Sequence, residues 1–152
     1  MPTMFRSVHR AFAGFVLSTL ALGACVSHHP EPAFRASVLI DDRGISIPLP
    51  PPSLVDEPEQ DVDVEGEVIG LAEGQGGLTV HIEDQAGGAA IDVPLAEGTH
   101  AFHAEGLPID LSDNCIELWL VDADGREGEH VEYQALIDAS GAAIEVSEGC
   151  DA

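Results

Sequence analysis

Residues 116–121 read Ile-Glu-Leu-Trp-Leu-Val, one of several segments of this chain in which apolar and other residues alternate. Aliphatic side chains occupy every second position up to Leu120, and Glu117 and Trp119 stand between them. A hydrophobic period of two is typical of a half-buried β-strand, because successive side chains of a strand point to opposite faces. The stretch therefore predicts a strand whose aliphatic residues face a core, with Trp119 on the other face.

The same alternation recurs on both sides of this stretch, at a spacing of roughly ten residues. Paired turn residues such as Gly87-Gly88, Asp124-Gly125 and Ser140-Gly141 separate the segments, and no stretch shows a helical period with a cap. This pattern predicts an all-β fold, a single antiparallel β-sandwich of about seven strands within residues 61–150. The expected strands lie at 61–68, 78–83, 91–95, around 101–102, and at 116–121, 131–137 and 144–147.

A family resemblance covers residues 98–131. Gly98-Thr99-His100-Ala101-Phe102 is followed by Asn114, Ile116 and Leu118, and then by Val121-Asp122-Ala123-Asp124-Gly125-Arg126. This arrangement is similar to bacterial Ig-like and fibronectin-like modules, in which a Gly-x-Phe strand precedes an Asn-x-Ile-x-Val strand that ends in Asp-x-x-Gly-Asn or Asp-x-x-Gly-Arg. The resemblance implies an Ig-like sandwich in a cell-surface setting. It implies no catalytic residue, since these modules serve mostly as spacers and in adhesion.

The N-terminal 24 residues read as an export signal. Arg6, His9 and Arg10 form a basic start, and residues 11–24 are then small and apolar, interrupted only by Ser18 and Thr19. A basic region, a short apolar region and a small-residue cleavage site are typical of a secretory signal peptide, whereas a membrane span needs about 20 apolar residues.

Leu22-Gly23-Ala24-Cys25 closes this segment and resembles the lipobox of bacterial lipoproteins. The resemblance implies cleavage before Cys25, acylation of its thiol and anchoring in a membrane. Val26 and Ser27 follow the cysteine in place of an aspartate, which by the same resemblance favours the outer membrane, with the domain on either its periplasmic or its external face. The alternative is a plain signal peptide with a chance cysteine at the cleavage point.

Residues 25–60 read as an acidic, proline-rich tether. Seven of the ten prolines lie there, including Pro50-Pro51-Pro52, and proline fixes φ and offers no amide donor. Within the tether, two apolar runs flank a turn at 41–44, so residues 37–47 are a candidate small hairpin that either docks on the domain or stays free of it.

The net charge of the chain limits the classes of partner that it can bind. Without residues 1–24 the chain holds all 28 acidic residues against Arg35, Arg43 and Arg126, so its formal charge is −25. This argues against nucleic acid, which is bound through clusters of lysine and arginine, and against electrostatic contact with a membrane surface. The carboxylates either keep the protein soluble or bind divalent cations. The weak calcium candidate is Asp122, Asp124, Glu127 and Glu129, and its alternative is an ordinary turn between strands.

Cysteine usage agrees with export. If Cys25 carries lipid, Cys115 and Cys150 remain as an even number in an oxidising compartment, which predicts a disulfide between them. A metal site built on these two cysteines is the competing interpretation, and it lacks the usual CxxC spacing.

Trp119 is the candidate partner contact of the domain, together with Glu117 on the same face. If that face is open, the ring is an exposed anchor for a protein or a glycan. If it is closed, the expected cover is the segment 38–47. Tyr133 is expected on the core face of its strand, where its hydroxyl needs a hydrogen-bond partner.

No catalytic arrangement stands out, since Gly-x-Ser-x-Gly is absent and the paired cysteines leave no free thiol nucleophile. The histidines, including His100 and His103, are expected to be polar surface positions without a metal. For His28 and His29 in the tether, the alternative is loose binding of a metal ion. The sequence thus favours a lipid-anchored, non-catalytic binding or spacer module without cofactor. The alternatives are a protein that binds divalent cations such as calcium, and an enzyme whose site is unrecognised.

Overall fold

A computed structural model describes residues 34–41, 43–71 and 75–150. The expected signal peptide, the lipobox with Cys25, and His28 and His29 lie outside these residues. Within the described part, no helix is long and apolar enough to cross a membrane.

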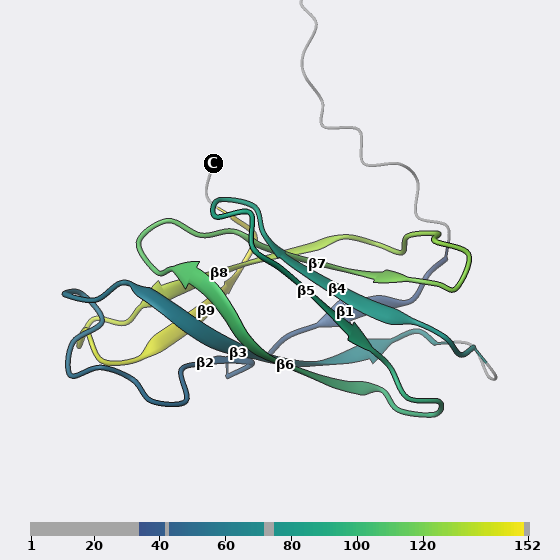
Figure 1. The fold of residues 1–152 in the computed structure, drawn as a ribbon, viewed down its shortest axis with the longest axis horizontal. Coiled ribbons are helices and arrows are strands. Elements are labelled where there is room, and N and C mark those ends of the chain that lie inside the picture. Colours follow the sequence, from purple (N-terminus) through teal and green to yellow (C-terminus); the bar gives the residue numbers. More distant parts are fainter. Residues whose placement is uncertain (1–33, 42, 72–74, 151–152) are drawn as a thin grey trace, which may run out of the picture.

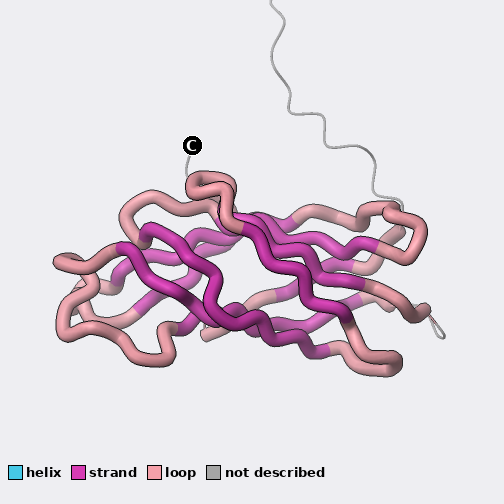
Figure 2. Tube along the Cα trace, viewed as in Figure 1, coloured by secondary structure: helices cyan, strands magenta, loops and turns pink. Residues whose placement is uncertain are grey.

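The described chain folds into two antiparallel sheets that pack face to face, with loops at both ends and no helix (Figures 1 and 2). This confirms the all-β sandwich, and each of the seven expected strands is present. Two short strands precede them. The strands are β1 (Ser37–Leu39), β2 (Ile45–Ser46), β3 (Glu59–Ile69), β4 (Thr79–Asp84), β5 (Ala90–Pro94), β6 (Ala101–Asp110), β7 (Ile116–Val121), β8 (Val131–Ile137) and β9 (Ile144–Glu148).

Sheet A is built around β3, which pairs with β6 on one side and with both β1 and β2 on the other. Ser37 lies opposite Ile69, and Ser46 lies opposite Asp63. The expected hairpin within residues 37–47 is therefore wrong, because β1 and β2 pair with β3 and not with each other. They run in the same direction and form one edge strand, which is interrupted between Leu39 and Ile45.

The sandwich begins well before residue 61, within the stretch expected to be a tether. Ala36, Val38, Ile40, Ile45 and Leu54 are all buried in the core. The proline content hides this contribution, because prolines cluster between residues 47 and 58 while the apolar residues before them alternate as a strand requires.

Sheet B has the order β5-β4-β7-β8-β9, so β7 is its central strand. Ile116, Leu118 and Leu120 of β7 are fully buried and face sheet A, as the alternation predicted. Burying each such side chain contributes roughly 1.5–3 kcal/mol, which makes β7 the main contributor of sheet B to the core.

Gly66 of β3 lies where its neighbours in sheet A, β6 and β1, crowd it closely. A Cβ atom at this position would lie 2.7 Å from the ring of Phe102 and 2.6 Å from the carbonyl oxygen of Leu39. The absence of a side chain at Gly66 thus leaves the space that the Phe102 ring fills.

Candidate functional site

Trp119 lies on the outer face of sheet B, opposite the core, and is nevertheless only 8% exposed. Its ring packs between two imidazoles, with the centroid of His81 at 4.2 Å and that of His130 at 4.4 Å. The His130 ring is nearly parallel to the indole, at an interplanar angle of 7°. The ring is therefore neither an open anchor nor covered by residues 38–47, whose strands pair in sheet A.

Strand register explains this stack. His81 of β4 pairs directly with Trp119 of β7, and the β7–β8 register aligns Leu118 with Val131, so His130 comes next to Trp119. Side chains directly opposite each other in neighbouring strands lie about 5 Å apart and pack together. The three rings thus form one row across three strands.

A carboxylate holds each imidazole of this row. Asp92 of β5 lies opposite His81, and its Oδ1 is 2.6 Å from His81 Nδ1. Glu117 Oε1 is 2.7 Å from His130 Nδ1. These contacts orient both rings over the indole faces.

Glu117 belongs to a second row on the same face. It lies opposite Glu83 of β4 and Glu132 of β8, so three like charges are neighbours across three strands. Glu117 is only 6% exposed, and its Oε2 accepts a hydrogen bond of 2.6 Å from Gln85 Nε2. The contacts of Glu117 with Gln85 and His130 therefore offset its repulsion by the two glutamates that lie opposite it.

The calcium candidate folds as a turn. Asp122 Oδ1 accepts hydrogen bonds from the backbone nitrogens of Asp124 and Arg126, each at 2.9 Å, and its Oδ2 accepts one from Arg126 Nε at 2.8 Å. The backbone hydrogen bond from Arg126 is the main reason that the pKa of Asp122 is lowered. Glu127 lies near His130, 3.5 Å from its Nε2, and Glu129 is exposed.

Among the described histidines, cysteines and acids, one group has its ligand atoms close enough together to hold a metal ion. It consists of Cys115, Glu132 and Cys150. Both cysteines of this group are bonded to each other, with their sulfur atoms 2.05 Å apart. The disulfide predicted from cysteine counting is thus present, and it joins the start of β7 to the chain after β9.

The outer face of sheet A carries a row of acids along β3. Side chains on one face of a strand repeat about every 6.8 Å, so this row of acids, which we call the carboxylate ladder, runs along most of β3. His103 of β6 lies beside it, with its Nδ1 2.9 Å from Glu65 Oε1 and its Nε2 3.3 Å from Glu105 Oε1. The carboxylate ladder consists of Glu59, Asp61, Asp63, Glu65 and Glu67.

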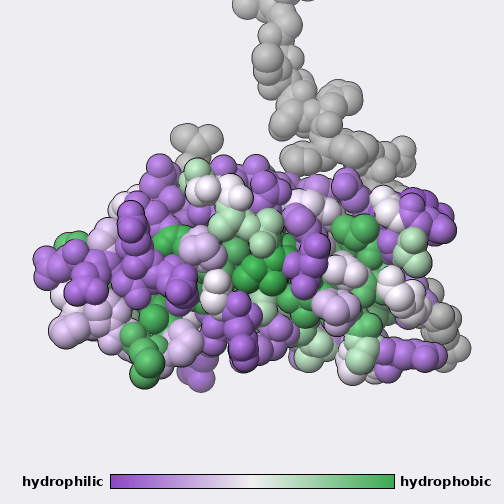
Figure 3. All heavy atoms as spheres, in the orientation of Figure 1, coloured by the Kyte–Doolittle hydropathy of each residue, from purple (hydrophilic) through white to green (hydrophobic). Residues whose placement is uncertain are grey.

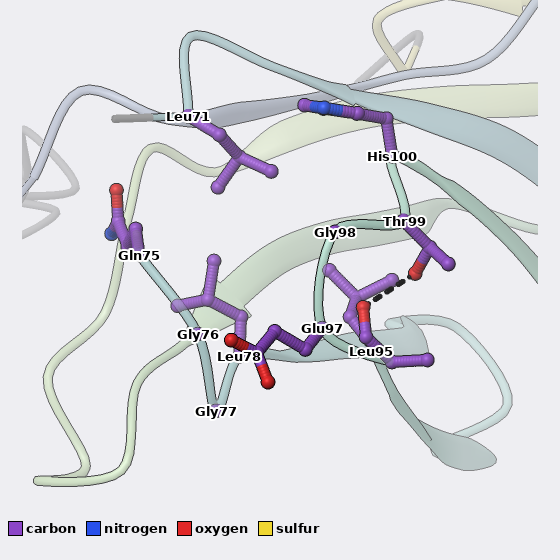
Figure 4. Close-up of a pocket in the computed structure, with 11 residues that line it drawn as sticks. Leu71, Gln75, Gly76, Gly77, Leu78, Leu95, Glu97, Gly98, Thr99 and His100 are labelled. Atoms are coloured by element: carbon purple, nitrogen blue, oxygen red, sulfur yellow. Dashed lines mark hydrogen bonds between the residues drawn. The ribbon is translucent and has the colours of Figure 1, made fainter. Parts of the chain in front are cut away.

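A hollow of about 280 Å³ opens at the end of the sandwich where the β3–β4 loop meets the β5–β6 turn (Figure 4). Leu71 and Leu78 project into the same space, and His100 lines it from the β5–β6 side. Thr99 Oγ1 donates a hydrogen bond to the Ala96 carbonyl oxygen at 2.7 Å, which stabilises the turn. The hollow is mostly apolar and just below the usual size of a small-molecule site.

The structure separates the histidines that the sequence grouped and brings together others. His100 lies at the hollow, and His103 lies beside the carboxylate ladder. The pairing of His81 and His130 around Trp119 was missed. The alternation within each strand indicates which residues share a face. The contact between these three rings depends on the register between strands that are distant in sequence, which alternation does not give.

No protein-family model matches the chain, and neither a curated protein nor a solved structure matches it.

Proposed function

We propose that this chain is a lipid-anchored, extracytoplasmic binding module of the bacterial cell envelope, without catalytic activity. The observation that carries the proposal is the Cys115–Cys150 disulfide downstream of a lipobox-like segment. Disulfides persist in oxidising compartments outside the cytoplasm, and acylation of Cys25 would hold the sandwich on a membrane surface. The outer membrane is the expected site, and the expected partner is a protein or a glycan of the envelope.

Strand order supports an Ig-like character for this module. In Ig-like sandwiches the second and fifth strands share one sheet, and the third, sixth and seventh share the other. Here β3 pairs with β6, while β4, β7 and β8 are neighbours in sheet B. With β1 as the first strand and β5 as an added edge of sheet B, this order follows the same scheme.

The anchor is tested by Cys25→Ser in the full chain. Cys25→Ser should lose the acyl mass, and the protein should be either released from the membrane fraction or left unprocessed with residues 1–24 still attached. The Cys115→Ser/Cys150→Ser control should keep its acyl mass and stay in the membrane fraction. Unchanged mass and fractionation of Cys25→Ser would overturn the anchor. A binding role without an anchor would then still be measurable with the purified protein.

The carboxylate ladder favours one second candidate, a domain that binds divalent cations at the outer face of sheet A. Five carboxylates on one strand face attract hard cations, which prefer oxygen ligands. Calcium should raise the melting temperature of the native protein, and Asp63→Asn/Glu65→Gln should reduce that increase. Glu97→Gln/Asp113→Asn is the control with the same loss of charge elsewhere. Equal calcium responses in both double variants would reject a site on the ladder.

A further inference from the structure

One edge of the sandwich is regular enough to accept another strand. The other edges carry features that hinder pairing, since β5 ends in Pro94, β6 contains Pro108, and the edge formed by β1 and β2 is interrupted after Leu39. The strand β9 runs without a proline from Ile144 to Glu148, and no strand of the described chain pairs with its outer side. Such an edge presents backbone groups with which another chain can pair.

The hydrogen bonds between β8 and β9 show which backbone groups face this edge. The Asp138 nitrogen donates to the Ala143 carbonyl oxygen at 2.9 Å, and the Gly149 nitrogen donates to the Glu132 carbonyl oxygen at 2.8 Å. Both bonds continue the register of the β8–β9 pair. In an antiparallel pair, residues that bond to the opposite strand alternate with residues whose N–H and C=O groups point away from it. The residues of β9 that point away from β8 are Ile144, Val146 and Glu148.

A groove beside β9 offers space for the inner side chains of an added strand. The strands β2 and β9 lie side by side (Figure 1), and a groove of about 290 Å³ separates them. Ile45 and Ile47 line it on the β2 side, and Ile144 lines it on the β9 side. Ile144 and Val146 pack against the core but are only half-buried. A strand added to β9 continues the inner face of sheet B over this groove, so apolar side chains on that face become buried.

The charge around this edge favours a basic partner. Glu145 and Glu148 are exposed, and neither makes an ion pair within the described part of the chain. The whole chain has a formal charge of −23, and hydrophilic residues take up much of the face shown in Figure 3. Opposite charges on neighbouring strands stabilise their pairing, and a basic partner is also attracted before contact. A second copy of this acidic chain is repelled.

We propose that β9 is a docking edge for an extended segment of a partner protein, in which basic side chains alternate with apolar ones. The segment joins sheet B as an added strand, with main-chain hydrogen bonds to Ile144, Val146 and Glu148. Its apolar side chains enter the groove, and its basic side chains lie on the outer face beside Glu145. The inference rests on the binding part of the proposed function and is independent of the lipid anchor.

The test measures amide hydrogen exchange by NMR in the isotope-labelled Cys25→Ser protein. The probe is a capped seven-residue peptide in which lysine and valine alternate. Saturating peptide should slow exchange at Val146 and Glu148 at least tenfold, because both N–H groups gain a backbone acceptor. The amide of Asp92, on the opposite edge of sheet B, is the internal control and should keep its exchange rate. The same peptide with N-methylated valines, which lacks the donors that face β9, should bind at least tenfold more weakly.

Two proline variants test the edge directly. Val146→Pro removes one outward donor and keeps the hydrogen bonds between β8 and β9, so the peptide should no longer protect Glu148. Ala90→Pro makes the matched change on β5 and should leave peptide binding unchanged. Melting curves show whether each variant keeps its fold.

A pair of charge variants tests the same edge without a change of backbone. Glu145→Gln/Glu148→Gln should weaken binding of the lysine–valine peptide several-fold, because the added strand loses its opposite charges. Glu97→Gln/Asp113→Asn has the same loss of charge elsewhere and should weaken binding less.

The inference is overturned if the lysine–valine peptide leaves exchange at Val146 and Glu148 unchanged. Equal binding of the N-methylated peptide also overturns it, since charge attraction alone then explains the contact. A third contrary outcome is a dimer of the protein alone, seen by light scattering and dissociated by Val146→Pro, because a second copy then occupies the edge. Membrane fractionation tests the anchor separately, so the two proposals can fail independently.

Discussion

The phenolic oxygen of Tyr133 lies 3.1 Å from the backbone nitrogen of Ile40 and accepts its hydrogen bond. Tyr133 stands in β8 of sheet B, and Ile40 follows β1 at the edge of sheet A. The sequence predicted that a hydroxyl at this core position needs a partner, and this is confirmed. The partner is an amide at the point where the edge strand is interrupted, so one side chain joins the two sheets.

Tyr133→Phe removes this bond and keeps the ring. The Ile40 amide is then buried without a partner, so the free energy of unfolding should fall by about 1–3 kcal/mol. Urea denaturation of the variant measures the loss. Gln134→Ala, on the outer face of the same strand, should change stability much less, and an equal effect of both variants would contradict the role of the hydroxyl.

Asn114 continues the pairing of β7 with β8 through its side chain. Its Nδ2 donates to the Ala135 carbonyl oxygen and its Oδ1 accepts from the Ala135 nitrogen, each at 2.9 Å. Asn114→Ala leaves both backbone groups of Ala135 without these partners, at a cost on the order of 3 kcal/mol. The exposed Ser147→Ala in β9 is the control in the same urea experiment, and a loss as small as that of the control would refute the pairing.

Reduction of the disulfide should lower the melting temperature. The bond closes a loop with a sequence separation of 35 residues, for which the chain-entropy model gives roughly 3–4 kcal/mol. At roughly 4–8 °C per kcal/mol for a small domain, the shift should exceed 10 °C. The Cys25→Ser protein is the suitable sample, because it has no third thiol. Two titratable thiols in this protein before reduction would be incompatible with the bond.

Trp119 should emit at short wavelength and resist quenching by acrylamide, because only 8% of it is exposed. His130→Ala opens one face of the indole, which should shift the emission to longer wavelength and increase the quenching constant. His103→Ala, on the other sheet, is the matched control and should leave both unchanged. A native emission spectrum typical of a solvent-exposed indole would disagree with the stack.

Acid should destabilise the domain through carboxylates that serve turns. Hydrogen bonds from the Ser112 side chain lower the pKa of Asp110, and those from the Ser140 side chain lower the pKa of Asp138, from an ordinary value of 3.8. A carboxylate whose folded pKa is lowered stabilises the fold above its unfolded pKa, and the contribution disappears as pH falls through the folded pKa.

Stability should therefore decline as pH falls below about 4. Carboxyl-carbon NMR titration should show Asp110 and Asp138 titrating below the ordinary aspartate value of 3.8. Ser112→Ala should raise the pKa of Asp110 alone, and Ser140→Ala that of Asp138 alone. Unchanged titration in both variants would assign the low pKa values to another cause.

The strands were predictable because each carries its own evidence. In β7, one face buries Ile116 and Leu118 while Glu117 and Trp119 take the other, and alternation of this kind is visible without knowledge of neighbours. The disulfide was predictable for a similar reason, since only one pairing is possible for the two cysteines that remain once Cys25 is set aside.

The edge strand and the cover of Trp119 were not predictable, because both depend on register. Ser37 meets Ile69, and His81 meets Trp119, across more than 30 residues of chain. Prolines near residue 50 also masked the core positions of β1 and β2, because a proline-rich composition is typical of linkers. Local sequence predicts which residues alternate, but not which strand they will meet.

The open edges of the two sheets have a consequence for behaviour at high concentration. The edge strand β5 has Asp92 at its centre and ends in Pro94, and Pro108 interrupts the donors of the edge strand β6. Proline and charged side chains on edge strands hinder edge-to-edge pairing with other chains, and the net charge of the domain adds mutual repulsion. At the β5 and β6 edges the molecule is thus protected against sheet-mediated aggregation, so copies that crowd together do not fuse their sheets there.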